Sequence, residues 1–313
     1  MTKMDALGGP LVTVIVPCYN HAAYVDSCLG SLLNETYENV ELIVIDDGSS
    51  DDSVKVIEAF APACRKRFVR FEFRARPNKG LCNTLNEALE WARGDFFAVT
   101  DSDDVVYPER IAVLLAAIDG RDDLNGIFGG GQLIGIDGQT MGSHVVKERV
   151  YTFDNLIARD KAMLSSCGLL RTEATRKVGG YLPGLWIEDW YIMLKLTQGG
   201  KNLKIIPAVL IGYRRHATNI SRDYVKMLNS RLQILDEFAP YPGLNKIKAQ
   251  VYVSAAIDCD RGQRLRSLRF LSTAIGTAAS IIFDSVFWGA VFRIAMPSPV
   301  MNLLRRLKGR QVF

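Results

Sequence analysis

The stretch VTVIVPCYNHAAYVDSCLGSLLNETYENVELIVIDDGSS, residues 12–50, contains the pattern that decides the fold. Its first five residues, 12–16, are all apolar or β-branched, which is typical of a strand buried on both faces of a parallel sheet. Residues 22–33 carry apolar side chains at three-to-four-residue spacing and predict a helix. Residues 40–45 predict a second buried strand. The order strand, helix, strand indicates a parallel sheet covered by helices.

The same alternation continues along the chain. We expect a helix over residues 51–60, with Ser49, Ser50 and Asp51 as capping candidates, and strands over 68–73 and 96–100. A helical run over 81–92 separates these two strands. The fold class is therefore α/β, with a doubly wound, mostly parallel sheet.

The pattern becomes irregular after about residue 125. Residues 126–136 look like two strands interrupted by the glycines 129–131, residues 189–196 look helical, and residues 203–213 look like a strand. From about residue 221 only helical periodicity is present. We therefore expect a sheet domain over residues 1–220 and a helical C-terminal region over residues 221–313.

The composition narrows the class of protein. The 313 residues are 48% hydrophobic and 23% charged, with 26 Gly and 11 Pro, which excludes collagen-like, low-complexity and mostly disordered chains. The net charge of +4 is uneven, because residues 261–313 contain nine Arg or Lys and a single acid, Asp284. The first 260 residues are therefore mildly acidic. We expect no nucleic-acid partner.

The cysteines and the apolar runs bear on the compartment. The six cysteines are scattered without a CxxC pair or zinc-ligand spacing, as expected for reduced residues of a cytoplasmic protein. The first ten residues contain no apolar run, so we expect no secretory signal there. The uncharged run over residues 270–283 is too short to span a membrane.

Polar clusters follow three of the predicted strands. The first strand ends in Pro17-Cys18-Tyr19-Asn20, the second in residues 46–50 (DDGSS) and the fourth in residues 101–104 (DSDD). Ligands of open parallel sheets bind at the carboxyl ends of the strands. Each cluster alone could be a turn, a helix cap or a solvated acidic loop. Three at one edge favour a binding site, and the three carboxylates of residues 101–104 favour a hard divalent cation.

These segments carry a resemblance. Together with RPNKGLCNTLNEALEWARGDFFAVTDSDD (residues 76–104), LPGLWIEDWYIMLKL (182–196) and YRRHATNIS (213–221), they resemble family 2 glycosyltransferases of the GT-A fold. The resemblance covers roughly residues 11–222. It implies an inverting, non-processive enzyme that moves a sugar from a UDP-, GDP- or dTDP-linked donor to a saccharide hydroxyl, in surface polysaccharide or glycan biosynthesis.

The resemblance implies a nucleotide site at the first two strand ends. Asp47 would accept a hydrogen bond from the ring N–H of a uracil-like base, and Asp46 would orient backbone amides of its loop. The residues that it places in the nucleotide-sugar site are Pro17, Tyr19, Asp46, Asp47, Asn78, Lys79, Gly80, Asp101, Ser102 and Glu188.

The resemblance also implies a metal site that binds Mn²⁺ or Mg²⁺. Residues 101–103 match the D-x-D signature, with Asp103 as the direct ligand and Asp101 on the metal, the ribose or a metal-bound water. The cation would neutralise the charge that builds on the diphosphate leaving group. His216 matches a late position that helps to hold the metal or the diphosphate. We read the other histidines, His21 and His144, as surface or packing residues.

Glu188 and Asp189 resemble the family's ED motif, which implies that Asp189 is the general base. The alternative reading makes Asp189 only a helix N-cap. Trp186 and Trp190 either stack on an acceptor sugar or belong to the core, and we expect the core for Trp190.

Two features bear on the acceptor. The Gln-x-x-Arg-Trp element of processive synthases is absent, since residues 198–201 (QGGK) and 263–266 (QRLR) do not match it. Transfer of one or a few sugars is therefore favoured over long-chain synthesis.

Cationic residues flank the apolar C-terminal stretch, which suggests a peripheral site on the anionic inner face of the plasma membrane and a polyprenyl-diphosphate-linked acceptor. The flanks are Arg261, Arg264, Arg266 and Arg269 on one side and Arg305, Arg306, Lys308 and Arg310 on the other. The alternative is a helical subdomain that packs on the catalytic domain or on a second copy in a homodimer.

Other functions fit less well. A sugar-nucleotide pyrophosphorylase shares the sheet but needs a Gly-rich loop where this chain has residues 17–20. A dinucleotide oxidoreductase needs a GxGxxG after the first strand, which is absent. A non-catalytic homologue that binds a nucleotide or a partner stays open.

Overall fold

The computed structural model describes residues 8–144, 146–158, 167–216, 223–259 and 263–296. The chain divides into two compact units, Met1–Asn219 and Ile220–Phe313, which we call the sheet unit and the helical unit. The assignment of residues 1–220 to a sheet domain and of residues 221–313 to a helical C-terminal region stays a prediction.

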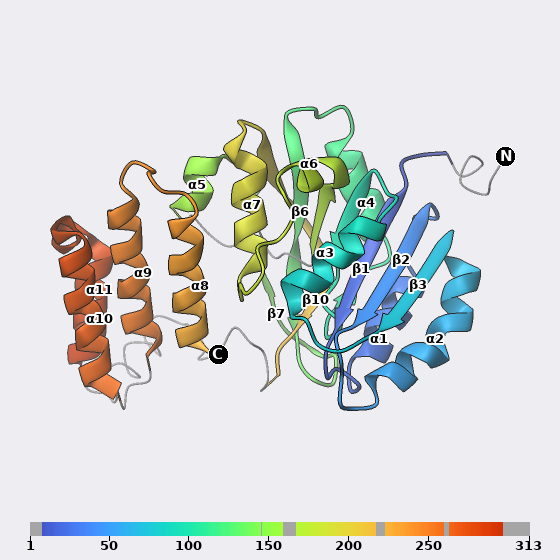
Figure 1. Ribbon diagram of the computed structural model, residues 1–313, viewed down its shortest axis with the longest axis horizontal. Helices are drawn as coiled ribbons and strands as arrows, with labels where there is room; N and C mark the ends of the chain where they lie inside the picture. Colours follow the sequence, from blue (N-terminus) through green and yellow to red (C-terminus); the bar gives the residue numbers. More distant parts are fainter. Residues whose placement is uncertain (1–7, 145, 159–166, 217–222, 260–262, 297–313) are drawn as a thin grey trace. The chain divides into compact units, whose positions relative to one another are not determined.

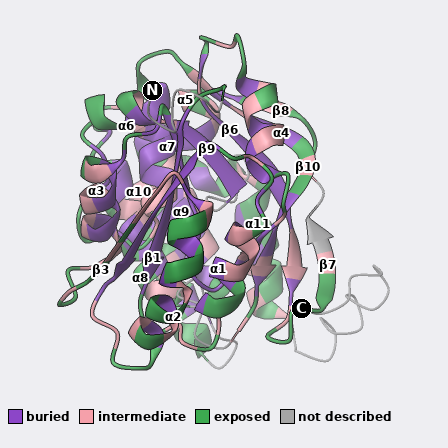
Figure 2. Cartoon of the chain, turned by 90° about the vertical axis from the view of Figure 1, so that its right-hand side faces the viewer, coloured by how far each residue is buried: buried purple, intermediate pink, exposed green. Residues whose placement is uncertain are grey.

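The parallel half of the sheet is built from the apolar runs of the N-terminal sequence (Figure 1). β1 (Val12–Cys18) lies between β2 (Val40–Asp46) and β4 (Phe96–Val99), and β3 (Arg70–Ala75) pairs with β2. All of these pairs are parallel. Every residue of β1 and β2 is buried, as Figure 2 shows for β1, because the strands are covered on both faces. The alternation of strands and helices predicted this part of the fold.

The other half of the sheet is mixed. The strand order is β3-β2-β1-β4-β9-β6-β10-β5, with β7 on β6 and β8 on β10. β9 runs antiparallel between β4 and β6, and β10 runs parallel to β6. The bounds are β5 Val105–Val106, β6 Leu124–Ile134, β7 Thr140–His144, β8 Arg149–Tyr151, β9 Gly168–Arg171 and β10 Asn202–Arg214.

The prediction of two strands in residues 126–136 was wrong, because β6 runs through the glycines without a break. A Cβ on Gly129 would lie 2.6 Å from Leu210 Cδ1 and 2.9 Å from the Ala208 carbonyl oxygen of β10. The glycine therefore allows a close approach of two strands, and it does not mark a turn.

Helices connect the strands of the sheet unit. α1 buries Val25, Cys28, Leu29 and Leu32, the spacing of an amphipathic helix. The helix predicted over residues 51–60 extends further, and its N-cap is Asp52, which makes no side-chain cap. The bounds are α1 Val25–Leu33, α2 Ser53–Arg67, α3 Leu81–Trp91, α4 Arg110–Ile118, α5 Phe153–Ile157, α6 Thr172–Lys177 and α7 Glu188–Gln198.

The helical unit has its own core. Alanines, aliphatic side chains and the Phe287 ring fill it, namely Ala249, Val253, Ala256, Leu271, Ala274, Ile281, Phe287 and Ala290. Its elements are α8 Tyr224–Asp236, α9 Leu244–Asp258, α10 Arg264–Thr277, the 3₁₀ helix η4 Ala279–Phe283 and α11 Ser285–Ala295. Among the described residues, no helix combines the length and apolarity needed to cross a bilayer. Arg261, Arg305, Arg306, Lys308 and Arg310 lie outside the described residues.

Candidate active site

The loops that follow β1 and β2 are joined at the carboxyl edge of the sheet. Asn20 has a φ of 54°, a left-handed conformation that Asn tolerates better than most residues. Its Oδ1 accepts a hydrogen bond from the Ser50 amide at 2.8 Å, and its own amide donates to Ser49 Oγ at 2.8 Å. The first two predicted polar clusters therefore form one surface.

Asp46 and Asp47 hold backbone amides from different loops. Asp46 Oδ1 accepts from the amides of Gly48 and Ser49 at 3.1 and 2.8 Å, so it shapes its own loop. Asp47 accepts from the amides of Lys79 and Gly80 at 2.8 and 2.9 Å. The buried Asp47 therefore seats the Asn-x-Gly segment that the sequence placed in the same site.

Gly48 and Arg76 also hold the loop after β2 against the segment of residues 78–80. Gly48 has a φ of 80°, and a Cβ there would lie 2.6 Å from the Asn78 amide nitrogen, so this position requires glycine. Arg76 donates to Asp47 and, at 2.8 Å, to Glu87 Oε2. Sequence reasoning missed Arg76, although it lies two residues before Asn78.

The remaining nucleotide-site residues differ in exposure. Pro17 is buried at the end of β1, whereas Tyr19 is 50% exposed beside it. The Lys79 ammonium lies 3.7 Å from Glu87 Oε2 on an exposed side chain. The open position of Tyr19 leaves its ring accessible to a ligand.

The acidic loop after β4 meets the end of β10. Asp103 Oδ2 lies 2.8 Å from His216 Nε2, and the Asp103 carbonyl accepts from Arg214 Nε at 2.7 Å. The Arg214 amide donates to Asp104 Oδ1 at 2.8 Å. Arg214 is buried and also donates to two carbonyls after β6, those of Gly135 and Ile136. This arginine, which the sequence did not single out, ties the loops that follow β4 and β6 to the end of β10.

His21 also belongs to this cluster, contrary to our expectation of a surface or packing residue. Its Nδ1 lies 2.7 Å from Ser102 Oγ. One ring nitrogen of His21, one of His216 and a carboxylate oxygen of Asp103 lie within 4.8 Å of one another. Burial lowers the pKa of His21, although the Asp103 charge opposes this shift. The neutral imidazole that burial favours is the form that binds metals. We call these three residues the His-Asp-His group.

Aromatic packing fixes the second imidazole. The ring of Tyr24, at the start of α1, stacks on His216 with centroids 4.8 Å apart and planes at 24°. The Arg214 guanidinium lies 5.6 Å from the centre of the Tyr24 ring. His216 is therefore held by packing on one side and by Asp103 on the other.

The ED pair forms the first turn of α7. The N-cap is Ile187, so the reading of Asp189 as the cap itself was wrong. Burial raises the pKa of Glu188 well above its usual value, and the charges of Asp189 and Asp101 add to the shift. Asp101, from the loop after β4, therefore lies close enough to the pair to interact electrostatically. Glu188, Asp189 and Asp101 therefore form a cluster of carboxylates, in addition to the His-Asp-His group.

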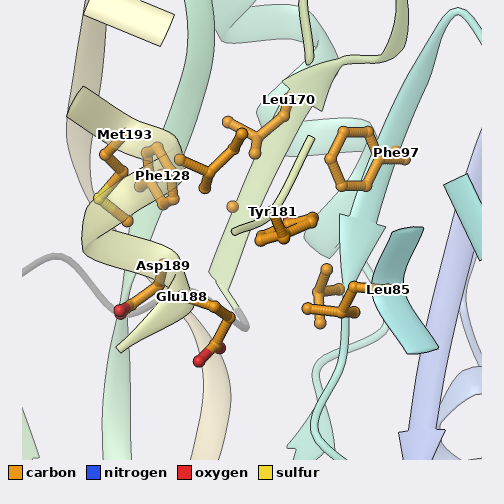
Figure 3. A pocket seen from close by; sticks show the side chains of 11 residues that line it. Leu85, Phe97, Phe128, Leu170, Tyr181, Glu188, Asp189 and Met193 are labelled. Carbon is orange, nitrogen blue, oxygen red and sulfur yellow. The ribbon is translucent and has the colours of Figure 1, made fainter. Parts of the chain in front are cut away.

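Apolar side chains support this second group. Figure 3 shows the Glu188 and Asp189 carboxylates directed away from Phe128, Leu170 and Met193. The cavity between them has a volume of about 20 Å³, room for about one water molecule, so it is too small for a sugar. Trp190 is buried, as expected for a core residue, and its Nε1 donates to the Leu156 carbonyl at 2.8 Å. Trp186 is 45% exposed.

Cys18 connects the nucleotide loops with the acidic loop. Burial raises the pKa of its thiol to about 11, although hydrogen bonds to Ser102 and Ser53 lower it. The charge of Asp46 also acts on this thiol. The first two strand ends and the loop after β4 thus meet at the end of β1.

A mixed sheet with acidic loops at its carboxyl edge has the architecture of the GT-A fold, and the solved structures support this class of fold. The first 349 residues of TarS from S. aureus, in complex with UDP-GlcNAc, match with a TM-score of 0.58 and 18% identity, over 87% of this chain and 90% of that one. The mannosyltransferase PcManGT from Pyrobaculum calidifontis, in complex with GDP-Man and Mn²⁺, matches with a TM-score of 0.60 and 16% identity, over 96% and 80%.

The sequence comparisons identify the family. The model of glycosyl transferase family 2 matches residues 13–171, and the chain belongs to this family. The chondroitin synthase of Escherichia coli is 36% identical over 107 residues, which are 34% of this chain and 15% of the relative. The glycosyltransferase GlyG of Streptococcus pneumoniae is 33% identical over 113 residues, 36% of each chain. The matched segments span about a third or less of the length of the curated relatives.

Proposed function

We propose that this glycosyltransferase is a metal-dependent, inverting enzyme that transfers one or a few sugars from a nucleotide-sugar donor to a saccharide hydroxyl in polysaccharide or glycan biosynthesis. The observation that carries the proposal is the arrangement of two clusters of ionisable side chains at the carboxyl edge of the sheet. Asp103 lies with two histidines, and Asp189 lies with Glu188 and Asp101. The loop of residues 101–103 contributes Asp103 to the first group and Asp101 to the second, so a cation on the donor diphosphate and a base facing the acceptor hydroxyl would act at one site.

The nucleotide would bind over the first two strand ends. Tyr19 and Pro17 would line the base, and the outer lone pairs of Asp47 would accept its ring N–H. The hydrogen bonds from Arg76, Lys79 and Gly80 hold the Asp47 carboxylate in place before the nucleotide arrives. Asn78 and Lys79 would close over the ribose and the diphosphate. Such preorganisation reduces the entropy lost on binding.

The donor set at Asp103 fits a divalent cation. It combines a carboxylate, which suits Mg²⁺ and Mn²⁺, with imidazole nitrogens, which suit transition ions, and the cation would neutralise charge on the leaving diphosphate. Asp101 would hold the ribose or a metal-bound water, between the metal and the ED pair. The preference for Mn²⁺ or Mg²⁺ is part of the proposal, and a Mn²⁺ complex of a GT-A neighbour supports a divalent ion.

Asp189 would be the general base. In a single in-line displacement the acceptor hydroxyl attacks the anomeric carbon from the face opposite the nucleotide, so a carboxylate must remove its proton on that side. Glu188 holds its proton more tightly than an ordinary Glu. It would therefore donate a hydrogen bond to a sugar hydroxyl while Asp189 takes the proton. The apolar side chains behind both groups (Figure 3) would restrict water on that side of the pair.

The helical unit would place the enzyme on an anionic membrane that carries a lipid-linked acceptor. Large apolar side chains are exposed along α10, η4 and α11, including Leu265, Leu268, Phe283, Trp288 and Phe292. Arg264, Arg266, Arg269 and Arg293 are exposed on the same helices. Cationic and exposed apolar residues on short helices fit the surface of an anionic bilayer.

A donor panel tests the proposed activity. The full chain would be incubated with Mn²⁺ or Mg²⁺ and UDP-, GDP- and dTDP-sugars, with and without saccharide acceptors, and nucleotide release would be measured. We expect metal-dependent release from one class of donor, accelerated by an acceptor. Donor binding without release under every combination would favour the non-catalytic alternative, and the absence of both would refute the nucleotide-sugar assignment.

A further inference from the structure

His21 is fixed at two points. Its amide donates to Ser53 Oγ of α2 at 3.0 Å, and its ring Nδ1 lies 2.7 Å from Ser102 Oγ. Its ring also faces that of His216 edge-on, with centroids 6.0 Å apart. An exposed histidine with no role at the site would not need these constraints. The Ser53 bond therefore holds the backbone of His21, and the Ser102 bond holds its ring against the acidic loop.

The distances fit a shared cation. Neighbouring ligands of an octahedral ion lie about 3.0 Å apart and opposite ligands about 4.2 Å apart, when each bond is about 2.1 Å long. Asp103 Oδ2 and His216 Nε2, 2.8 Å apart, already have the spacing of neighbouring ligands. No pair in the His-Asp-His group exceeds 4.8 Å. A shift of about half an ångström would bring all three atoms onto one ion.

We propose that His21 is a ligand of the same cation as Asp103 and His216, and that this pair of imidazoles makes the site select Mn²⁺ over Mg²⁺. The inference rests on the proposed function for the presence of a cation. Mg²⁺ strongly prefers oxygen ligands and retains its waters, whereas imidazole nitrogens suit transition ions. A site formed by carboxylates alone would not discriminate in this way.

Ser102 would be the positioning residue for His21. Metal-bound histidines usually bond a second group through the ring nitrogen that does not touch the metal, which fixes the tautomer. The Ser102 hydroxyl occupies Nδ1, so Nε2 is the nitrogen that we assign to the ion. The middle residue of the D-x-D segment thus acts through the histidine and not on the nucleotide sugar.

The test measures metal binding directly, with the full chain and no sugar donor. Free Mn²⁺ would be quantified by electron paramagnetic resonance, and Mg²⁺ would be titrated in competition. We expect His21→Ala to weaken Mn²⁺ binding at least about tenfold and Mg²⁺ binding less than about threefold. His144→Ala, which removes the third histidine of the chain, is the matched control and should change neither affinity.

His21→Asp distinguishes ligation from a merely structural role. An oxygen ligand at this position should strengthen Mg²⁺ binding above that of the unmodified protein and reduce the preference for Mn²⁺, with a melting temperature near that of the unmodified protein. Equal losses of both ions in His21→Ala, or no loss of either, would overturn the proposal. A loss of UDP binding in metal-free buffer would also overturn it, by assigning His21 to the diphosphate. A chain that binds Mn²⁺ through His21 but transfers no sugar would refute only the proposed function.

Discussion

The two units of this glycosyltransferase depart from ordinary globular packing in opposite ways. In the sheet unit, charged groups are buried at the strand ends, among them Asp46, Asp47, Asp103, Asp104 and Arg214. In the helical unit, the core is filled by alanines, aliphatic side chains and Phe287, while several other large apolar groups are exposed. Phe283 is 87% exposed and Trp288 59%.

Each of these two departures lowers the stability of the folded protein when no ligand or partner is bound. A buried carboxylate must be compensated by hydrogen bonds and opposite charges, and exposed aromatic rings lose the free energy of burial. The bonds to Asp46, Asp47 and Asp103 provide that compensation only in one loop arrangement, which preorganises the edge for a ligand. In the described part of the helical unit, Phe283, Trp288 and Phe292 remain exposed, although the Trp288 ring meets Phe287 edge-on. The comparison therefore favours the proposed polar ligand for the sheet unit and the proposed contact with an apolar surface for the helical unit.

The largest expected effect tests the polar edge. Asp189→Asn keeps the shape of the side chain but removes the base, so we expect sugar transfer to fall by about 10²–10⁴-fold. Donor binding, measured by calorimetry with UDP- or GDP-sugars, should stay within about threefold because the nucleotide loops are untouched. Transfer at the unmodified rate would show that another group takes the proton.

The second prediction tests the apolar surface. Replacing Arg264, Arg266 and Arg269 by Gln should weaken binding to vesicles that contain phosphatidylserine by about a hundredfold, since each surface cation contributes about 1 kcal/mol. Trp288→Ser should also weaken it, whereas Trp186→Ser, an exposed tryptophan of the sheet unit, is the matched control and should not. Sedimentation with vesicles measures the partition. A protein that stays in the supernatant and has the mass of a dimer would assign the surface to a second copy.

The third prediction compares glycines of the two units. Gly129→Ala should destabilise the protein by about 1–3 kcal/mol, because its Cβ would meet the Leu210 side chain and a backbone oxygen of β10. Gly276→Ala on α10 meets nothing within 4 Å and should stabilise by about 0.5–1 kcal/mol. Chemical denaturation measures both. Equal effects would contradict the close packing of β6 on β10.

Much of the sheet unit follows from its sequence. The apolar runs before Pro17, Asp46 and Asp101 predicted the strands, and parallel strands bring their carboxyl ends together, so the common edge could be expected. The glycines 129–131 were misread because a close contact between strands and a turn select the same residue. β9 has only four residues and lacks a periodic pattern, so its insertion between β4 and β6 was not visible.

The missed site residues share a physical reason. Arg214 bonds to Asp104 across 110 positions, Arg76 bonds to Asp47 across 29, and His21 meets Ser102 across 81. Pairing at such separations depends on strand order and register, which local patterns do not specify. The position of His21 just beyond the first buried strand was the one available signal, because that edge carried the other polar clusters.

The smallest expected effect is the loss of folding stability that ionisation of the buried Glu188 at the start of α7 causes. Because burial and the charges of Asp189 and Asp101 raise the pKa of Glu188, the folded protein retains a proton that the unfolded chain releases above about pH 4.5. Stability therefore falls as the pH rises from there toward the raised pKa. Glu188→Gln removes this dependence, so we expect the melting temperature to be about 2–4 °C higher than that of the unmodified protein at pH 7.5 and equal at pH 4.

Glu87 provides the control of opposite sign within the same unit. Although burial raises the pKa of Glu87, its bonds with Arg76 and Arg74 lower it overall. Its contribution is therefore present above the unfolded pKa and is lost as the pH falls, so Glu87→Gln should destabilise at pH 7.5 and less so at pH 4. Scanning calorimetry at both values measures the two differences. If the melting temperatures of the two variants changed with pH in the same direction, the ionised carboxylates of α7 would not destabilise the folded protein, which would contradict this prediction.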